Sequence, residues 1–216
     1  LLDNLEGEDK VLRHRFLSII DQEADWLTEL INDLLDLSRL ESEQYAAHMD
    51  LLSLNEVIDG AMTLLDHQVR RVGVTVDLDV PTDLPLMVGD KELLTILVKN
   101  LLSNAAKFSG PGASVELTAR HDSGCLVLCV EDQGMGIPQE DLSNLFTKFY
   151  RSSVSREAGV RGTGLGLVLA KEAVDLHDGI IDLESELGVG TSVTVTLPVK
   201  GQEVEDARRE RDRAYG

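Results

Sequence analysis

Apolar residues recur at helical spacing over residues 10–40, a stretch that contains neither proline nor glycine. Ile20, Leu27 and Leu34 are each seven positions apart, which places them on one face of a continuous helix. A helix of this length reaches about 45 Å. Its apolar stripe is broad enough to need a partner helix, and no other segment of the chain is long enough to cover it. We therefore expect the partner to lie N-terminal to residue 1, in a second subunit, or in both.

Residues 41–48 are polar and predict a linker, after which helical and strand patterns alternate. Asp90 stands where the N-cap of a helix is needed. The tail from Gly201 mixes both signs of charge with almost no apolar residues, and it is expected to be disordered. The expected elements are a helix over Leu54–Val72, strands over Val74–Asp79 and Leu84–Val88, a helix after Asp90, a hairpin of Ala113–Arg120 and Cys125–Asp132, a short helix near Glu140–Phe146, a helix over Leu165–His177, and a hairpin of Ile180–Glu184 and Thr191–Pro198.

The composition limits the classes of function. Its 216 residues suffice for one or two domains with a buried core. The chain carries 39 acidic and 20 basic side chains, a formal net charge of −19, which argues against nucleic acid as a partner. A nucleotide is not excluded, because it needs only a local positive pocket and a metal. No apolar run approaches the roughly 18–20 residues that span a bilayer, and the N-terminus has no signal-peptide pattern.

Cys125 and Cys129 lie four positions apart in a strand-like run. Such positions are separated by about 13 Å along a strand, which is too far for a disulfide. A metal site is not expected without further ligands nearby. We interpret both cysteines as buried small hydrophobic residues in a reducing compartment.

The most informative segment is the helix that runs through Asn100, Asn104 and Lys107. These residues are four and three positions apart, so their side chains project from neighbouring turns of one face. Amide oxygens are suitable ligands for a hard cation such as Mg²⁺, and a lysine supplies a point charge for phosphate. The alternative interpretation is an amphipathic helix with a polar outer face.

A glycine-containing turn follows the predicted strand that ends at Asp132. Gly134 and Gly136 would let backbone approach a flat base closely, and a carboxylate at the strand end can accept from the exocyclic amine of adenine. An ordinary Asp-x-Gly turn is the alternative.

A second glycine-rich segment, residues 162–167, opens the helix predicted over Leu165–His177. Glycines at a helix start expose free amides, and the helix dipole favours an anionic phosphate there. The segment is neither a P-loop, because no Gly-Lys-Ser/Thr follows, nor a dinucleotide fingerprint, because a polar loop precedes it. A flexible turn is the alternative.

An aromatic and basic segment, residues 146–151, leads into a polar loop that ends at Arg161. The aromatic residues would anchor one end of a mobile lid, while Lys148, Arg151 or Arg161 reaches phosphates. A solvated basic loop is an equally good interpretation for any one of these cations.

These four segments follow one another within about 70 residues, and in this order they resemble the N, G1, F and G2 boxes of sensor histidine kinases. That family belongs to the superfamily shared with gyrase-type and chaperone ATPases. Residues 19–42 also resemble the second helix of the family's dimerisation and phosphotransfer hairpin. The resemblance implies an α+β fold, with part of that hairpin over residues 1–42, a catalytic ATP-binding domain over residues 43–200 built as a mixed sheet under three helices, and a charged tail over residues 201–216.

The resemblance also implies ATP and Mg²⁺ as cofactors and assigns roles to the residues of the four boxes. Asn104 would be the direct Mg²⁺ ligand, with Asn100 as a second candidate, and Asp132 would bind the adenine amino group. The complete set of residues expected to contact the nucleotide is Asn100, Asn104, Lys107, Asp132, Gly134, Gly136, Lys148, Arg151, Arg161, Gly162, Thr163, Gly164, Leu165, Gly166 and Thr191.

None of the five histidines fits the family's phosphoacceptor motif, in which an acid follows the histidine. His14 is followed by Arg-Phe-Leu, and His177 is expected to cap a helix C-terminus. We therefore expect the acceptor histidine to precede Leu1, so that this chain binds ATP without autophosphorylating. The resemblance further implies a homodimer formed through the hairpin, a response-regulator aspartate as the next acceptor, a cytoplasmic location, and membrane attachment only through N-terminal regions outside these residues.

Two other functions stay open at this point. One is an ATPase or serine kinase of the same superfamily, of the anti-sigma-factor type, against which the hairpin-like N-terminal helix argues. The other is an interaction module with a degenerate pocket, against which the retained polar residues of every box argue.

Overall fold

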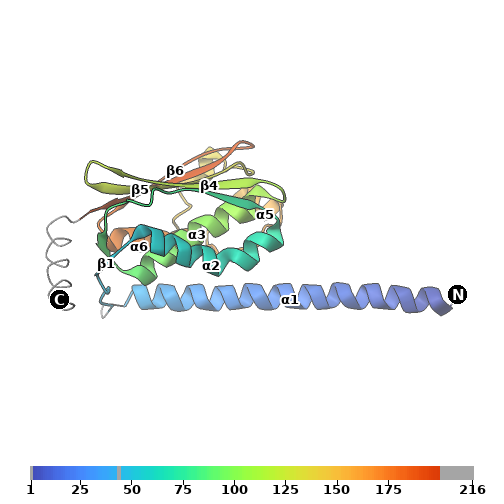
Figure 1. Ribbon diagram of the computed structural model, residues 1–216. Helices are drawn as coiled ribbons and strands as arrows, with labels where there is room; N and C mark the ends of the chain where they lie inside the picture. The colour runs from blue at the N-terminus through green and yellow to red at the C-terminus, as the bar shows by residue number, and fades with distance from the viewer. Residues whose placement is uncertain (1, 43–44, 200–216) are drawn as a thin grey trace.

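A single layer of three helices lies between a five-stranded sheet and the long N-terminal helix in the computed structural model (Figure 1). The structure describes residues 2–42 and 45–199, so the tail predicted from Gly201 lies outside the described residues. The helices are α1 (Leu2–Leu40), α2 (Leu54–Val72), α3 (Lys91–Ser109), α4 (Gln139–Leu142), α5 (Ser153–Glu157) and α6 (Gly166–Leu176). The strands are β1 (Asp50–Leu52), β2 (Thr75–Asp79), β3 (Met87–Gly89), β4 (Ser114–Asp122), β5 (Cys125–Asp132), β6 (Ile180–Glu186) and β7 (Gly190–Pro198).

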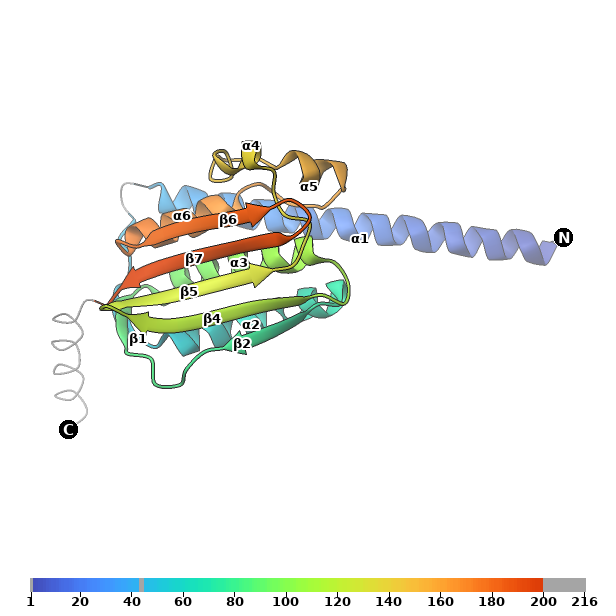
Figure 2. The same ribbon diagram turned by 90° about the horizontal axis from the view of Figure 1, so that it is seen from above.

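The main sheet has the strand order β2-β4-β5-β7-β6, which Figure 2 shows from above. The β2–β4 pair is parallel and the other pairs are antiparallel, so the sheet is mixed as expected. Ser123 and Gly124 connect β4 to β5 with positive φ angles of 50° and 80°, the geometry of a tight hairpin turn. A separate two-stranded sheet pairs β1 with β3.

The core lies between one face of the main sheet and the helices α2, α3 and α6. α3 is central, because its apolar side chains meet both the sheet and the neighbouring helices. The least exposed large side chains, all under 2% exposed, include Leu54, Ile58, Leu94, Leu97, Leu102, Leu117, Leu128 and Leu169. The predicted α/β arrangement, a mixed sheet under three helices, is therefore confirmed.

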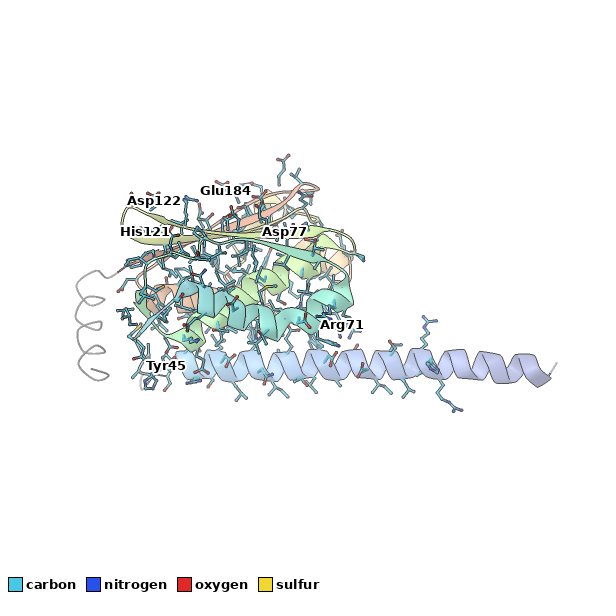
Figure 3. All side chains as sticks on the ribbon, in the orientation of Figure 1. Tyr45, Arg71, Asp77, His121, Asp122 and Glu184 are labelled. Carbon is cyan, nitrogen blue, oxygen red and sulfur yellow. The ribbon has the colours of Figure 1, made fainter. Side chains whose placement is uncertain are left out.

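The opposite face of the sheet carries exposed carboxylates. Asp77 is paired in register with Glu116, and Glu116 with Glu131, so three acidic residues form one row across three strands. Asp77 and Glu184 lie on this outer face in Figure 3. Like charges directly opposite one another destabilise a sheet.

Asp90 caps α3 as predicted, because its Oδ1 accepts from the backbone N–H groups of Glu92 and Leu93 at 3.0 and 3.1 Å. Its second oxygen accepts from the linker, at 2.9 Å from the backbone nitrogen of His48 and at 3.3 Å from the hydroxyl of Tyr45. These bonds outweigh the cost of burial and lower the pKa of Asp90.

His177 is the C-cap residue of α6 and is 2% exposed. Its Nε2 accepts from the backbone N–H of Asp90 at 2.9 Å, and Nδ1 lies 2.6 Å from the carbonyl of Ala173. The ring therefore connects the end of α6 to the beginning of α3, with Nδ1 as the donor. His177 therefore caps the C-terminus of α6 as predicted, because Nδ1 bonds a carbonyl of the last turn, and its Nε2 makes a second contact, with the start of α3, that was not predicted.

The apolar stripe of α1 divides between two surroundings. Leu37 is buried in a cluster with Leu165, Val168 and Leu169, and Leu30 packs against that cluster. The domain therefore covers part of the stripe, which the sequence interpretation assigned wholly to a partner helix. The side chains that stay exposed include Leu12, Phe16, Leu17, Ile19, Ile20, Leu27, Ile31, Leu34 and Leu35.

Several smaller expectations need correction. The three-residue strand β1 was not predicted, β3 begins at Met87 instead of Leu84, and the loop after residue 151 contains the short helix α5. Cys125 and Cys129 are half-buried free thiols and not fully buried hydrophobic residues. Within the described part of the chain, no helix combines the length and apolar character that crossing a bilayer requires.

Candidate functional site

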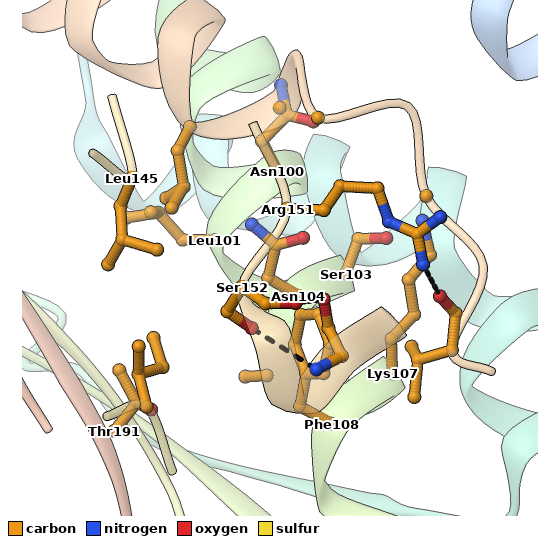
Figure 4. A pocket seen from close by; sticks show the side chains of 18 of the residues that line it. Asn100, Leu101, Ser103, Asn104, Lys107, Phe108, Leu145, Arg151, Ser152 and Thr191 are labelled. Carbon is orange, nitrogen blue, oxygen red and sulfur yellow. Dashed lines mark hydrogen bonds between the residues drawn. The ribbon is translucent and has the colours of Figure 1, made fainter. Parts of the chain in front are cut away.

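The polar face of α3 forms the floor of a pocket, and its amides lie at the centre of the site. Asn100 and Asn104 both line the pocket, with Arg151 and Lys107 to one side and Leu145 and Thr191 to the other (Figure 4). Asn100 is only 7% exposed, and its Nδ2 has no hydrogen-bond partner among the described residues. A buried amide without a partner is costly, so this group is suited to a polar ligand.

Three basic side chains predicted to reach phosphate line the same pocket: Lys107, Arg151 and Arg161. Lys107 Nζ lies 2.5 Å from Glu29 Oε1 of α1, and Arg151 donates to the backbone carbonyl of Val160 in the adjoining loop. The three cations expected from the sequence therefore line the pocket, and two of them are paired with carboxylates of α1.

Asp132, the last residue of β5, supplies a buried carboxylate at 8% exposure. Its Oδ1 accepts from the backbone N–H of Gly134 at 2.8 Å, and its pairing partner across the sheet is Thr191 on β7. Burial raises the pKa of Asp132, although hydrogen bonds from the backbone of Gly134 and Thr191 oppose this shift. A buried acceptor at a strand end can take a hydrogen bond from an amine that enters the pocket.

Close backbone contacts explain the two glycines that follow. A Cβ on Gly134 would lie 2.4 Å from the carbonyl oxygen of Phe108, at the C-terminal end of α3. A Cβ on Gly136, whose φ is +65°, would lie 2.0 Å from the carbonyl oxygen of Glu186 in β6. The turn therefore packs closely between α3 and the β6–β7 hairpin. These glycines are required by the backbone packing, in addition to any contact that they make with a ligand.

The second glycine segment meets both α1 and the amides of α3. Thr163 donates to Asp33 Oδ2 of α1 at 2.6 Å, while its own hydroxyl oxygen accepts from the backbone N–H of Leu165 at 3.2 Å. A Cβ on Gly166 would lie 3.0 Å from Asn100 Oδ1, so a glycine here leaves the amide room. Burial is the main cause that raises the pKa of Asp33.

The aromatic segment is anchored by a carboxylate that sequence reasoning did not identify. Asp141 of α4 is 6% exposed, and it accepts from the hydroxyl of Tyr150 at 2.5 Å and from the Ser153 backbone N–H and hydroxyl at 2.9 and 2.8 Å. Those bonds lower the pKa of Asp141, the bond from Tyr150 most of all. Asp141 therefore fixes Tyr150, which lines the pocket, to the N-terminal end of α5. In sequence it resembles an ordinary acid in the first turn of a helix, and no pattern singled it out.

Most of the predicted site residues converge on this pocket. Three do not line it: Lys148 forms an ion pair with Glu41, Leu165 packs in the core beside Leu37, and Gly134 lies within the turn. Their predicted contacts with nucleotide remain predictions. The predicted residues that line the pocket are Asn100, Asn104, Lys107, Asp132, Gly136, Arg151, Arg161, Gly162, Thr163, Gly164, Gly166 and Thr191.

The donor set fits a nucleotide with an attached metal. The pocket offers an apolar portion beside Met135, Ile137 and Leu145, the buried carboxylate of Asp132, two amides and three cations, and α1 adds the carboxylates of Glu29 and Asp33. Apolar side chains with a few fixed polar groups are typical of sites that hold a flat base. Amide oxygens with phosphate oxygens and water form the kind of ligand set that Mg²⁺ takes.

Known proteins resemble this chain in sequence and fold. Residues 89–201 match the family described as Histidine kinase-, DNA gyrase B-, and HSP90-like ATPase. The chain is 38% identical over 184 residues to the histidine protein kinase DivJ of Caulobacter vibrioides, covering 85% of this chain and 31% of that protein. It is 32% identical over 205 residues to the sensor histidine kinase WalK of Bacillus subtilis, covering 92% of this chain and 33% of that protein.

A solved structure shares the same fold. The crystal structure of full-length ShkA in complex with AMPPNP superposes with a TM-score of 0.70 at 22% identity, and the match covers 86% of this chain and 38% of that one. The chain spans about a third of the length of DivJ and WalK.

Proposed function

Because this chain belongs to the histidine kinase-, DNA gyrase B- and HSP90-like ATPase family, and carries the catalytic domain of the sensor histidine kinases within it, we propose that its pocket binds ATP with Mg²⁺ for transfer of the γ-phosphoryl group to a histidine. One observation carries the proposal. Three separate parts of the sequence line one pocket: the face of α3 that carries Asn100, Asn104 and Lys107, the end of β5 at Asp132, and the glycine segment before α6.

Each group has a role in this proposal. Asp132 accepts from the adenine amino group, and Lys107, with Arg151 or Arg161, contacts the phosphates. Asn104, with Asn100 beside it, would hold Mg²⁺, which would neutralise phosphate charge. Gly166 and its neighbours at the start of α6 leave room for backbone amides to approach the phosphates.

The reaction proposed for the whole protein is a phosphoryl transfer. A nitrogen of the acceptor imidazole forms a bond to the γ-phosphorus as the bond from that phosphorus to the bridging oxygen of ADP breaks. We propose that the acceptor histidine lies outside this chain, that a receiver-domain aspartate takes the phosphoryl group next, and that the exposed stripe of α1 pairs with helices of a second copy.

The proposal keeps the domain boundaries that were predicted from the sequence. We assign residues 1–42 to the dimerisation and phosphotransfer hairpin and residues 43–200 to the catalytic domain. Both relatives named above align over more of this chain than residues 89–201 alone, which favours the histidine kinase over an anti-sigma-factor type of serine kinase.

Calorimetric titration of the chain with a non-hydrolysable ATP analogue and Mg²⁺ tests nucleotide binding. We expect binding by the parent chain and loss of binding in Asn104→Ala, with Asn55→Ala as a matched control. Asn55 is a half-buried amide at the start of α2 that donates to the carbonyl of Pro81 and does not line the pocket. A parent chain that binds no analogue would instead indicate a degenerate module.

The acceptor needs a second experiment. Adding an upstream segment with a histidine followed by an acid should restore autophosphorylation, and the phosphate should be labile to acid, as expected of phosphohistidine. An acid-stable phosphate on serine would favour the serine kinase.

A further inference from the structure

Carboxylates of α1 face the cations of the pocket. Lys107 Nζ lies 2.5 Å from Glu29 Oε1, and Arg161 Nη2 lies 2.8 Å from Glu23 Oε1. Glu29 also lines the pocket itself. Two of the three cations that line the pocket in the described part of the chain are thus paired with acids from a helix outside the predicted catalytic domain.

The same side of α1 brings a third acid to the pocket. Asp33, which is 3% exposed, lines the pocket and accepts from Thr163 at the start of the glycine segment. Leu37, one turn further along, is buried against α6. This apolar contact and the hydrogen bond keep α1 beside the pocket, so the carboxylates of Glu23 and Glu29 lie near any anion that enters.

We propose that Glu23 and Glu29 compete with the phosphates of the nucleotide for Arg161 and Lys107, so that docking of α1 opposes nucleotide binding. The inference rests on the proposed function, because it takes the pocket to be the nucleotide site. A triphosphate is a stronger partner for these cations than a single carboxylate, since it brings several charged oxygens. The nucleotide therefore displaces the α1 carboxylates, and the energy spent on displacing them weakens its binding.

The two ion pairs differ in strength. The side chain of Lys107 is only 19% exposed, whereas those of Arg161 and Glu23 are 44% and 56% exposed. Exposed pairs are weak and screened by salt, so the Glu29–Lys107 pair should dominate the competition. Because coupling between two binding events is reciprocal, nucleotide must loosen α1 by the same factor by which α1 weakens nucleotide binding.

Removing the carboxylates tests the competition in the full chain. Glu29→Gln and the double variant with Glu23→Gln are titrated with a non-hydrolysable ATP analogue and Mg²⁺ at low salt. We expect affinity to increase about threefold to tenfold in the double variant, mostly through Glu29, and the increase to shrink at high salt. Thermal unfolding of the variants without analogue should be unchanged or occur at slightly lower temperature, because an ion pair has been lost.

Asp25→Asn is the matched control. Asp25 of α1 also pairs with a cation of the domain, Arg71 Nη1 of α2 at 2.7 Å, but neither residue lines the pocket. The same change of charge on the same helix should leave nucleotide affinity within twofold of the parent. Figure 3 shows Arg71 at the end of α2, beside α1.

The outcomes separate this inference from the proposed function. If the parent chain binds no analogue, the proposed function fails and the competition fails with it. If the parent chain binds but the double variant binds equally or more weakly, only the competition is refuted, since the carboxylates would then be neutral or would assist the ligand. An equal gain in Asp25→Asn would also refute it, because the effect would come from general loosening of α1 and not from shared cations.

Discussion

Replacing Asp132 by asparagine should raise stability and abolish most nucleotide binding, two effects of opposite sign from one carboxylate. The carboxyl group is buried at the end of β5, and burial raises its pKa above the ordinary value of 3.8. A carboxyl group whose pKa is higher in the folded than in the unfolded chain makes the folded state less stable as the pH rises from the unfolded pKa through the folded pKa, because the buried group must then ionise. Asparagine has nearly the same shape and can still accept from Gly134, but it does not ionise.

The loss of binding follows because asparagine cannot accept the hydrogen bond that the Asp132 carboxylate would take from the adenine amino group. With its oxygen committed to Gly134, the amide nitrogen faces the adenine amino group, so a donor meets a donor. A hydrogen bond to a charged group contributes about 1.5–3 kcal/mol, which corresponds to roughly a tenfold to hundredfold loss of affinity.

Titration with an ATP analogue measures the affinity, and urea unfolding at pH 7 and near pH 4 measures the stability. We expect Asp132→Asn to be at least as stable as the parent at pH 7 and this advantage to decline toward pH 4. Glu184→Gln makes the same change of charge on the exposed outer face of the sheet and is the control. Affinity within twofold of the parent, or lower stability than the parent at pH 7, would refute the reasoning.

Three further predictions concern packing and charge. Gly136→Ala should destabilise the chain by about 2–4 kcal/mol in urea unfolding, because the new Cβ would lie 2.0 Å from the Glu186 carbonyl oxygen. The control is Gly188→Ala, which also has a positive φ but no atom within 4 Å of the new Cβ, and it should lose only about 1 kcal/mol. Equal losses in the two variants would contradict the close-contact argument. Glu131→Lys should raise the unfolding free energy by about 0.5–1 kcal/mol by relieving repulsion with Glu116, and a gain that persists in high salt would point to another cause. Tyr150→Phe should lower both nucleotide affinity and the midpoint of urea unfolding, since Asp141 loses its bond from the phenol; an unchanged affinity would show that Asp141 does not help to hold that wall of the pocket.

The larger elements were predictable because their patterns are long or their turns are specific. α2 was predicted with its observed limits, and the β4–β5 hairpin follows from alternation around Ser123-Gly124. β1 was missed because a three-residue strand has no periodicity of its own and exists through its pairing with β3. α5 was not predicted, because its five residues lie in a segment rich in Ser, Arg and Gly that has no helical pattern. Its first turn is stabilised by Ser152 Oγ, which accepts from the Ser155 backbone N–H at 3.3 Å.

The site could be predicted where the spacing of residues within one segment determines the direction in which their side chains point. Asn100, Asn104 and Lys107 share a helix face, and all three line the pocket. Lys148 and Arg161 lie in segments where spacing says little about direction, and their ion pairs with Glu41 and Glu23 depend on where α1 packs. Asp141 could not be found from sequence, because its burial depends on Tyr150 and Ser153 folding back onto it.

The carboxylate of Asp90 has a mechanical consequence. It holds Tyr45 and the backbone of His48 with one oxygen and starts α3 with the other. A displacement of the segment that joins α1 to the domain is therefore transmitted through Asp90 to the first turn of α3, the helix that bears Asn100 and Asn104. Strain introduced at this joint should reach the pocket along the axis of α3, without passing through the sheet.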